Sequence, residues 1–171
     1  MKSIKRMALF VAAGIFTMNA FAQTSDIVDV AVGSKDHTTL VAAVKAADLV
    51  GTLKSAGPFT VFAPTNAAFG KLPAGTVETL LKAENKAQLT GVLTYHVVSG
   101  TINAKDVLAA IKKGKGKAVL TTVAGGKLTA AVEDGKVVLT DENGGKSTVI
   151  ATDLAASNGI IHVIDSVLLP K

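Results

Sequence analysis

The sequence predicts an α+β domain in which helices pack against an antiparallel sheet or sandwich. Most apolar residues between 26 and 113 recur at the 3.6-residue spacing of helices, whereas from Lys117 they alternate with a period of two. The second half is also interrupted by Gly125-Gly126, Asp134-Gly135 and Asn143-Gly144, and such pairs favour the tight turns of hairpins. Helices first and hairpins afterwards are typical of the α+β class.

The first half is expected to be mainly helical. Leu40, Val41 and Val44 begin a helical pattern that continues to Lys54 and stops at Gly57-Pro58. Asn85 and Gln88 resemble a capping box, and Asn103 is a second candidate helix cap. The expected helices cover residues 26–31, 38–54, 67–72, 76–82, 86–96 and the segment after Asn103, with short strands at 59–63 and 97–98.

The second half is expected to form a β-meander. Each stretch is rich in Val, Ile, Leu and Thr, and a Gly-containing turn separates it from the next. The expected strands cover residues 117–123, 127–133, 136–140, 147–152 and 160–169.

Residues 1–22 have the pattern of a secretory signal peptide. Three basic residues, an apolar run over 7–18 and the small-x-small sequence Ala20-Phe21-Ala22 follow one another. An uncleaved membrane anchor is the alternative, but a spanning helix needs about 20 apolar residues, and Asn19 ends this run early. We therefore expect cleavage after Ala22 and a single domain over residues 23–171 that is secreted or periplasmic.

The exported part differs in composition from the whole chain. The 171 residues carry 18 basic and 13 acidic side chains, a net charge of +5, but Lys2, Lys5 and Arg6 precede the cleavage site, which leaves 15 basic residues and a net charge of +2. The chain has no Cys, which excludes disulfides, thiolate metal sites, a cysteine nucleophile and a lipid-modified Cys. A mature chain without Arg and with few aromatic residues gives little basis for nucleic-acid binding.

The sequence contains no recognisable catalytic motif. His37, His96 and His162 have no second ligand at a zinc-binding helical spacing, and neither Gly-x-Ser-x-Gly nor a phosphate-binding loop is present. His96 and His162 lie among aliphatic residues, which favours hydrogen-bonded core or junction histidines over metal ligands or catalytic groups. We expect no enzyme activity, cofactor or metal. A hydrolase whose triad assembles in space is the least favoured alternative.

Charged clusters offer two further interpretations. Four lysines, Lys112, Lys113, Lys115 and Lys117, lie within six positions and predict either a solvated loop or a contact with an anionic glycan or lipid. The acidic pairs at 133–134 and 141–142 flank glycines. Polar hairpin tips explain these pairs better than calcium ligands, because the rest of an EF-hand loop is missing.

Three segments together resemble the fasciclin-like domain family. They are GPFTVFAPTNAAF at residues 57–69, LTYHVVSG at 93–100 and GIIHVIDSVLLP at 159–170. They look like the first signature box, the central tyrosine–histidine motif and the second box of that family, in the same order. The resemblance implies a wedge-shaped antiparallel β-sandwich with a layer of helices from the N-terminal half, in which the two boxes are neighbouring strands.

The resemblance also implies roles for individual residues. His96 and Asn66 match positions that hold the junction of the boxes by hydrogen bonds, so we expect them, with Tyr95 and His162, to be structural. Animal matrix relatives such as periostin contact integrin near positions that match Tyr95, His96, Asp106 and Val107. Val107 replaces an Ile there, and Ser99 stands where many members have Pro, so a specific receptor does not follow.

Family members are mostly extracellular adhesion modules, and the short signal followed by one domain looks bacterial. The resemblance therefore implies a non-catalytic module that binds a protein, matrix or cell-surface partner. The alternative is a binder of anionic glycan or lipid through the Lys112–Lys117 loop.

Overall fold

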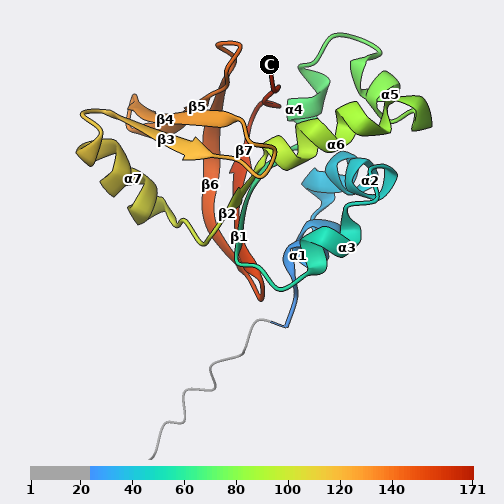
Figure 1. Cartoon of the computed structure of the whole chain (residues 1–171), viewed down its shortest axis with the longest axis horizontal. Coiled ribbons are helices and arrows are strands. Elements are labelled where there is room, and N and C mark those ends of the chain that lie inside the picture. Colours follow the sequence, from blue (N-terminus) through green and yellow to red (C-terminus); the bar gives the residue numbers. More distant parts are fainter. Residues whose placement is uncertain (1–23) are drawn as a thin grey trace, which may run out of the picture.

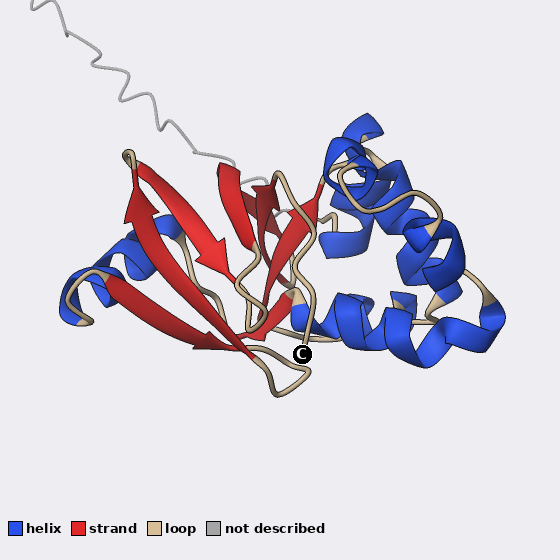
Figure 2. Cartoon of the chain, turned by 90° about the horizontal axis from the view of Figure 1, so that it is seen from above, coloured by secondary structure: helices blue, strands red, loops and turns tan. Residues whose placement is uncertain are grey.

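The computed structural model describes residues 24–171. The predicted signal peptide therefore lies outside the described residues. Helices from the first half gather on one side of the molecule, the strands form the other side, and one further helix lies apart from the others against the strands (Figures 1 and 2). This arrangement confirms the predicted α+β class and the layer of helices from the N-terminal half.

Seven α-helices and two short 3₁₀ helices occur in residues 24–171. The α-helices are α1 (Ile27–Val32), α2 (Thr38–Ala46), α3 (Val50–Lys54), α4 (Asn66–Gly70), α5 (Thr76–Leu80), α6 (Lys86–Tyr95) and α7 (Ala104–Lys113). The 3₁₀ helices are η1 (Lys35–His37) and η2 (Ala83–Asn85). All of them fall within or beside the segments that the apolar spacing marks as helical.

The single helix predicted over residues 38–54 was wrong, because Asp48 divides it into α2 and α3. Asp48 has φ 59°, in the left-handed region that usually requires Gly. The Asp48 N–H donates to the Lys45 carbonyl and the Leu49 N–H to the Val44 carbonyl, at 3.1 and 3.0 Å. These two bonds form a Schellman helix end. The sequence does not indicate this helix end, because Asp48 stands at the left-handed position where a Schellman end usually has Gly.

Only one of the two predicted helix caps forms. The Asn103 side chain accepts from the Asp106 N–H at 3.0 Å, and the Asp106 carboxylate accepts from the Asn103 N–H at 3.2 Å. The Asn85–Gln88 capping box was wrong. Asn85 is the last residue of η2, with φ −103° and ψ 13°, which is not the extended backbone of a cap, and its side-chain amide donates to the Thr79 carbonyl at 2.7 Å.

The strands form one sheet in the order β2-β1-β7-β6-β5-β4-β3. Their bounds are β1 (Phe59–Pro64), β2 (Val97–Ser99), β3 (Lys117–Thr121), β4 (Lys127–Glu133), β5 (Lys136–Thr140), β6 (Lys146–Ala156) and β7 (Gly159–Ile164). The predicted meander is confirmed, because β3 to β7 pair antiparallel in chain order. The long strand β6 has two register shifts. An isolated bridge between Val98 and Thr122 joins the two ends of the sheet.

One pair in this sheet is parallel. β1 and β7 run side by side from the pair Phe59–Gly159 to the pair Pro64–Ile164, so the first and second boxes are neighbouring strands. This pairing confirms the prediction that the two boxes are neighbouring strands. It also corrects the expectation of an antiparallel sheet, because these two strands are parallel. Gly159 is needed for the close approach, since a Cβ there would collide with the Phe59 carbonyl oxygen. β7 also ends at Ile164, five residues earlier than predicted, because Asp165 turns to accept from the Thr148 N–H at 2.8 Å.

Two apolar clusters fill the interior. The first joins α1, α2, α3 and α6 to one face of β1 and β7, with Leu40, Leu53 and Leu93 among its buried members. The second lies inside the curved sheet and under α7, around Phe62 and Tyr95. Alternate residues of β1 and β7 thus serve different clusters, which explains why the two boxes are apolar on both faces.

We predict that the backbone at Asp48 limits the stability of the helical layer. Asp48→Ala should lower the free energy of unfolding by about 1 kcal/mol, because a Cβ without a compensating polar group is strained at positive φ. Asp48→Gly should be at least as stable as the wild type. Urea unfolding of the two variants measures this difference. Loss of the Lys86 ion pair is common to both variants, so it cancels. Equal stability of the Ala and Gly variants would contradict the prediction.

Candidate functional site

The central motif is fixed around His96, at the end of α6. The ring is buried; its Nδ1 lies 2.7 Å from the Val92 carbonyl oxygen, and its Nε2 accepts from the Leu168 N–H at 3.0 Å. The His96 carbonyl accepts from the Phe62 N–H at 2.9 Å. One residue therefore contacts α6, the first box and the end of the second box.

These contacts define the charge and tautomer of His96. Nε2 faces an N–H group, so it must be the unprotonated nitrogen, and Nδ1 carries the proton that is donated to Val92. Burial lowers the pKa of His96 from 6.5 to about 4, against smaller opposing effects of the Val92 hydrogen bond and Asp141. The ring is neutral at pH 7 and has no free nitrogen for a metal or a proton-transfer step.

Tyr95 is also fully buried, in the second apolar cluster inside the curved sheet. Its hydroxyl donates to the Lys127 carbonyl at 2.8 Å and accepts from the Glu142 N–H at 3.2 Å. Burial raises the pKa of this phenol. A Cβ at Gly126 would collide with the ring, so this glycine allows the β3–β4 turn to pack directly on Tyr95. Tyr95 thereby joins α6 to two turns of the meander.

His162, on β7, also has a buried ring that contacts backbone groups through both nitrogens. Its Nε2 lies 2.8 Å from the Ile102 carbonyl oxygen, so this nitrogen donates, and its Nδ1 faces the Asp153 N–H at 3.4 Å. The ring stacks on Phe62 with a centroid separation of 5.6 Å. His162 ties the loop before α7 to the sheet.

Asn66 makes structural hydrogen bonds, but not the ones that the resemblance implied. Its Oδ1 accepts from the Thr39 N–H at 3.0 Å and from the Thr38 hydroxyl at 3.1 Å, and its amide donates to the Lys35 carbonyl at 2.9 Å. Asn66 therefore joins the first box to the start of α2 rather than to the second box. The β1–β7 ladder and His96 hold the two boxes together.

Two polar residues that sequence reasoning missed complete this framework. Asp141, expected only as part of a polar turn, is buried and accepts from the N–H groups of Asn143, Gly145 and Leu169 at 2.9, 2.7 and 3.0 Å. Its spacing to Asn143 is that of an Asx-turn, which was the available signal. Asn158 accepts from the Ile27 N–H at 3.0 Å and donates to the Leu53 carbonyl at 2.6 Å; no local signal marks this long-range role.

The structure separates the four residues matched to integrin contacts. Tyr95, His96 and Val107 are buried, and their side chains are packed in the interior. Asp106 is exposed, but one of its carboxylate oxygens completes the α7 cap. A partner can therefore reach Asp106 on the surface, whereas the other three residues would require the domain to open.

The predicted lysine loop is an ordered turn between α7 and β3. Lys115 has φ 56°, its N–H donates to the Lys112 carbonyl at 3.3 Å, and the Gly116 N–H donates to the Ile111 carbonyl at 2.8 Å. All four lysines are exposed, and none forms an ion pair with another residue in 24–171. Lys112 and Lys113 end α7, Lys115 lies in the turn and Lys117 begins β3. The segment Lys112–Lys117 thus presents four positive charges in a defined shape.

Neither a metal centre nor a spanning helix is found in the described part of the chain. Residues 24–171 contain no group of three His, Asp or Glu side chains placed to hold a metal ion. Among the same residues, no helix has the length and apolar character needed to cross a membrane.

We predict that His96→Leu lowers the free energy of unfolding by about 1–3 kcal/mol, because it leaves the Val92 carbonyl and the Leu168 N–H buried without partners. Gln88→Leu, an exposed change on the same helix, is the matched control and should change stability by less than about 0.5 kcal/mol. Chemical denaturation measures both. Equal effects of the two substitutions would show that the histidine contacts are not stabilising.

We also predict an acid-sensitive stability. Between pH 6.5 and 4 the unfolded chain binds a proton at His96 that the folded chain does not, so this contribution is complete above pH 6.5 and is lost as the pH falls to about 4. The loss should reach roughly 3 kcal/mol, and buried His37, whose pKa burial also lowers, adds in the same direction. Urea unfolding at pH 7, 5.5 and 4 tests this, and His96→Gln should flatten the slope. An unchanged slope would refute the assignment.

The comparisons with known proteins agree with this framework. The Fasciclin domain family model matches residues 35–170. The chain is 56% identical to Protein sll1483 of Synechocystis over 84% of this chain and 73% of that protein. It is 38% identical to the immunogenic protein MPB70 of Mycobacterium bovis over 78% of this chain and 63% of that protein. Human periostin is 30% identical over 79% of this chain but only 15% of its own length.

A solved structure shows the same fold. A fasciclin domain pair from the insect cell adhesion molecule Fasciclin I matches with a TM-score of 0.73 and 22% identity, over 85% of this chain and 51% of that one. The two boxes lie side by side, the tyrosine–histidine motif fixes their ends, and the family model covers most of the sequence. This chain belongs to the Fasciclin domain family.

Proposed function

We propose that the chain is an exported, non-catalytic adhesion or interaction module that binds a protein or cell-surface partner. The main support for the proposal is that the motif side chains are committed to contacts inside the domain. Tyr95, His96 and His162 are hydrogen-bonded to backbone groups of this chain and buried. The motifs thus build a scaffold, and partner binding falls to exposed surfaces. The similarity to an insect cell adhesion molecule supports the same role.

The exposed side of α7 is the best-supported contact surface. Val107 and Ile111 anchor this helix in the interior, which leaves Asp106, Leu108 and the lysines outside. Leu108 is 39% exposed, so an apolar contact lies among charged groups. Of the four residues that the family resemblance implied as contacts, only Asp106 belongs to this surface. The other three are buried, and Leu108 and the lysines take their place as candidate contacts.

We predict that the α7 surface is needed for attachment. In cells that lack the gene, wild-type protein should restore attachment or aggregation, whereas Leu108→Asp with Asp106→Lys should reduce it several-fold. Val32→Asp on α1 is the matched control, because Val32 is 56% exposed and α1 lies with the other helices, apart from α7 (Figures 1 and 2). Cell attachment is counted on several surfaces. Full attachment by the α7 variant, or no effect of gene deletion, would contradict the proposal.

Export is a separate part of the proposal, and it rests on the signal pattern of residues 1–22. The mass of the protein recovered outside the cytoplasm should correspond to a chain that begins at Gln23. Retention of the full 171-residue chain in the cytoplasm would exclude this part.

A second candidate function is the binding of anionic glycans or lipids by the Lys112–Lys117 turn. It is favoured by four exposed lysines that have no acidic partner within residues 24–171. Binding to heparin or to vesicles with anionic lipid should weaken steeply with ionic strength and after Lys→Ala changes in the turn. Lys82 and Lys136, exposed elsewhere, provide control substitutions of equal charge. Salt-independent binding would reject this candidate.

A further inference from the structure

The sequence contains two Asn-Gly pairs, Asn143-Gly144 and Asn158-Gly159. In such a pair the backbone nitrogen of Gly can attack the Asn side chain, because Gly has no Cβ to hinder the approach. The attack converts Asn to aspartate or isoaspartate, which makes Asn one of the thermolabile residues. The two pairs have the same chemistry, so any difference between them comes from the fold.

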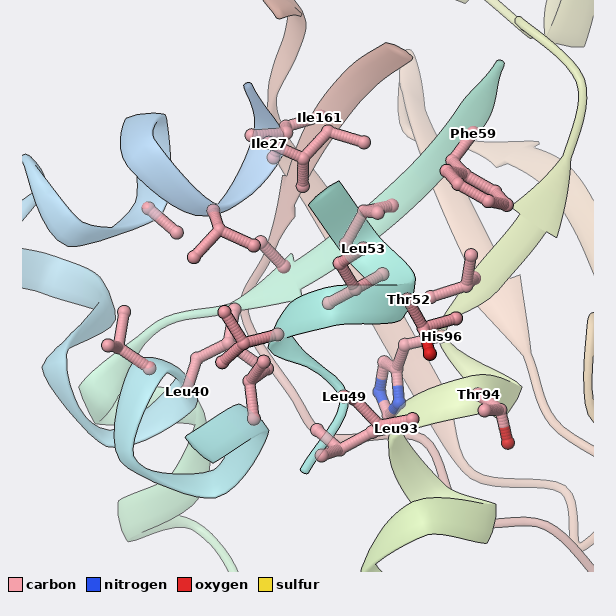
Figure 3. Close-up of a pocket in the computed structure, with 18 of the residues that line it drawn as sticks. Ile27, Leu40, Leu49, Thr52, Leu53, Phe59, Leu93, Thr94, His96 and Ile161 are labelled. Carbon is pink, nitrogen blue, oxygen red and sulfur yellow. The ribbon is translucent and has the colours of Figure 1, made fainter. Parts of the chain in front are cut away.

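Asn158-Gly159 is fixed at the junction of the helical layer and the sheet. The Asn158 side chain accepts from the Ile27 N–H at 3.0 Å and donates to the Leu53 carbonyl at 2.6 Å. Ile27 and Leu53 are themselves buried and line the apolar pocket between the helices and the sheet (Figure 3). Gly159 begins β7 and pairs with Phe59. The Asn158 side chain therefore cannot turn toward the Gly159 nitrogen while the domain is folded.

Asn143-Gly144 lies in the β5–β6 turn, where both residues are exposed. A Cβ at Gly144 would meet nothing within 4 Å, so the space around this residue is open. The Asn143 amide donates to the Leu169 and Pro170 carbonyls at 3.0 and 3.1 Å, and the Gly144 N–H donates to the Asp141 carbonyl at 3.2 Å. Exposed bonds of this kind open locally without unfolding of the domain. The reacting atoms of this pair can therefore meet in the folded protein.

We propose that Asn143 is a site of spontaneous deamidation that releases the end of the chain beyond Leu168. The Gly144 backbone nitrogen attacks Cγ of Asn143 and forms a bond to it. The bond between Cγ and Nδ2 breaks, and ammonia leaves with the proton that the Gly144 nitrogen loses. Water then opens the resulting succinimide at either carbonyl, which gives aspartate or isoaspartate. The products carry a carboxylate where the amide stood.

The new carboxylate cannot replace the amide at the chain end. It has no hydrogen to donate to the two carbonyls, and its negative charge repels their oxygens. The Leu169 N–H keeps its bond to the Asp141 carboxylate at 3.0 Å, but this residue is only half-buried. Leu168 is fully buried, and its N–H donates to His96. Deamidation therefore loosens the residues after Leu168 and leaves the His96 junction intact.

Incubation of the folded protein in mildly alkaline buffer, followed by digestion with trypsin and mass spectrometry, tests the modification. Trypsin cleaves after Lys136 and Lys146, so the two pairs fall in separate peptides, 137–146 and 147–171. Peptide 137–146 should change with time from the amide mass to the acid mass, faster at higher pH because the Gly144 nitrogen must lose its proton. Peptide 147–171 should stay unchanged in the folded protein and convert in urea.

Asn143→Gln is the matched variant, because its longer side chain would have to close a six-membered ring, which forms far more slowly. It should keep peptide 137–146 unmodified over the same period. Absence of conversion at Asn143 in the folded wild type overturns the proposal. Equal conversion of the two peptides in the folded protein overturns the role of the fold.

Asn143→Asp reproduces the aspartate product and tests the release of the chain end. Amide hydrogen exchange followed by NMR should be faster at Leu169 than in the wild type and unchanged at Leu168, which also shows that the variant is folded. Asn85→Asp makes the same chemical change on the helical side and should leave Leu169 as in the wild type. Unchanged exchange at Leu169 in Asn143→Asp overturns the release.

Discussion

The fold depends on one buried, neutral histidine at the meeting point of its parts. His96 ends α6, and its carbonyl accepts a bond from β1 while its ring accepts one from Leu168, beyond β7. The helical layer, the first box and the second box therefore share a single residue. Because the ring has one donor and one acceptor only when it is neutral, the packing around it determines both its tautomer and its charge.

Tyr95 and Asp141 are also buried polar residues whose side chains bond backbone groups from distant segments. Tyr95 satisfies backbone groups at the start of β4 and in the β5–β6 turn, and Asp141 satisfies backbone groups in the same turn and beyond β7. Buried polar groups of this kind are costly unless every partner is present, and here the partners come from segments far apart in the sequence. The motif residues thus account for the uniqueness of the fold, while the surface of α7 and the lysine turn remain available for partners.

Sequence reasoning succeeded where a local period or turn determines the structure. The limits of β4 and β5 were predicted to the residue, because alternation and Asp134-Gly135 define that hairpin locally. It failed where a residue takes an unusual backbone conformation or a distant partner. Asp48 ends a helix in place of Gly, and the parallel pairing of β1 with β7 joins segments about 100 residues apart. The buried role of Asp141 and the bonds of Asn66 to α2 depend on such packing, and so they required the structure.

The ionisation and tautomer of His96 test the central claim most directly. Two-dimensional ¹⁵N–¹H NMR of the histidine rings distinguishes the protonated nitrogen and follows it with pH. The structure predicts that His96 carries its proton on Nδ1 and stays neutral from pH 7 down to about 4 while the chain is folded. A proton on Nε2, or titration near pH 6.5 in the folded protein, would contradict the account.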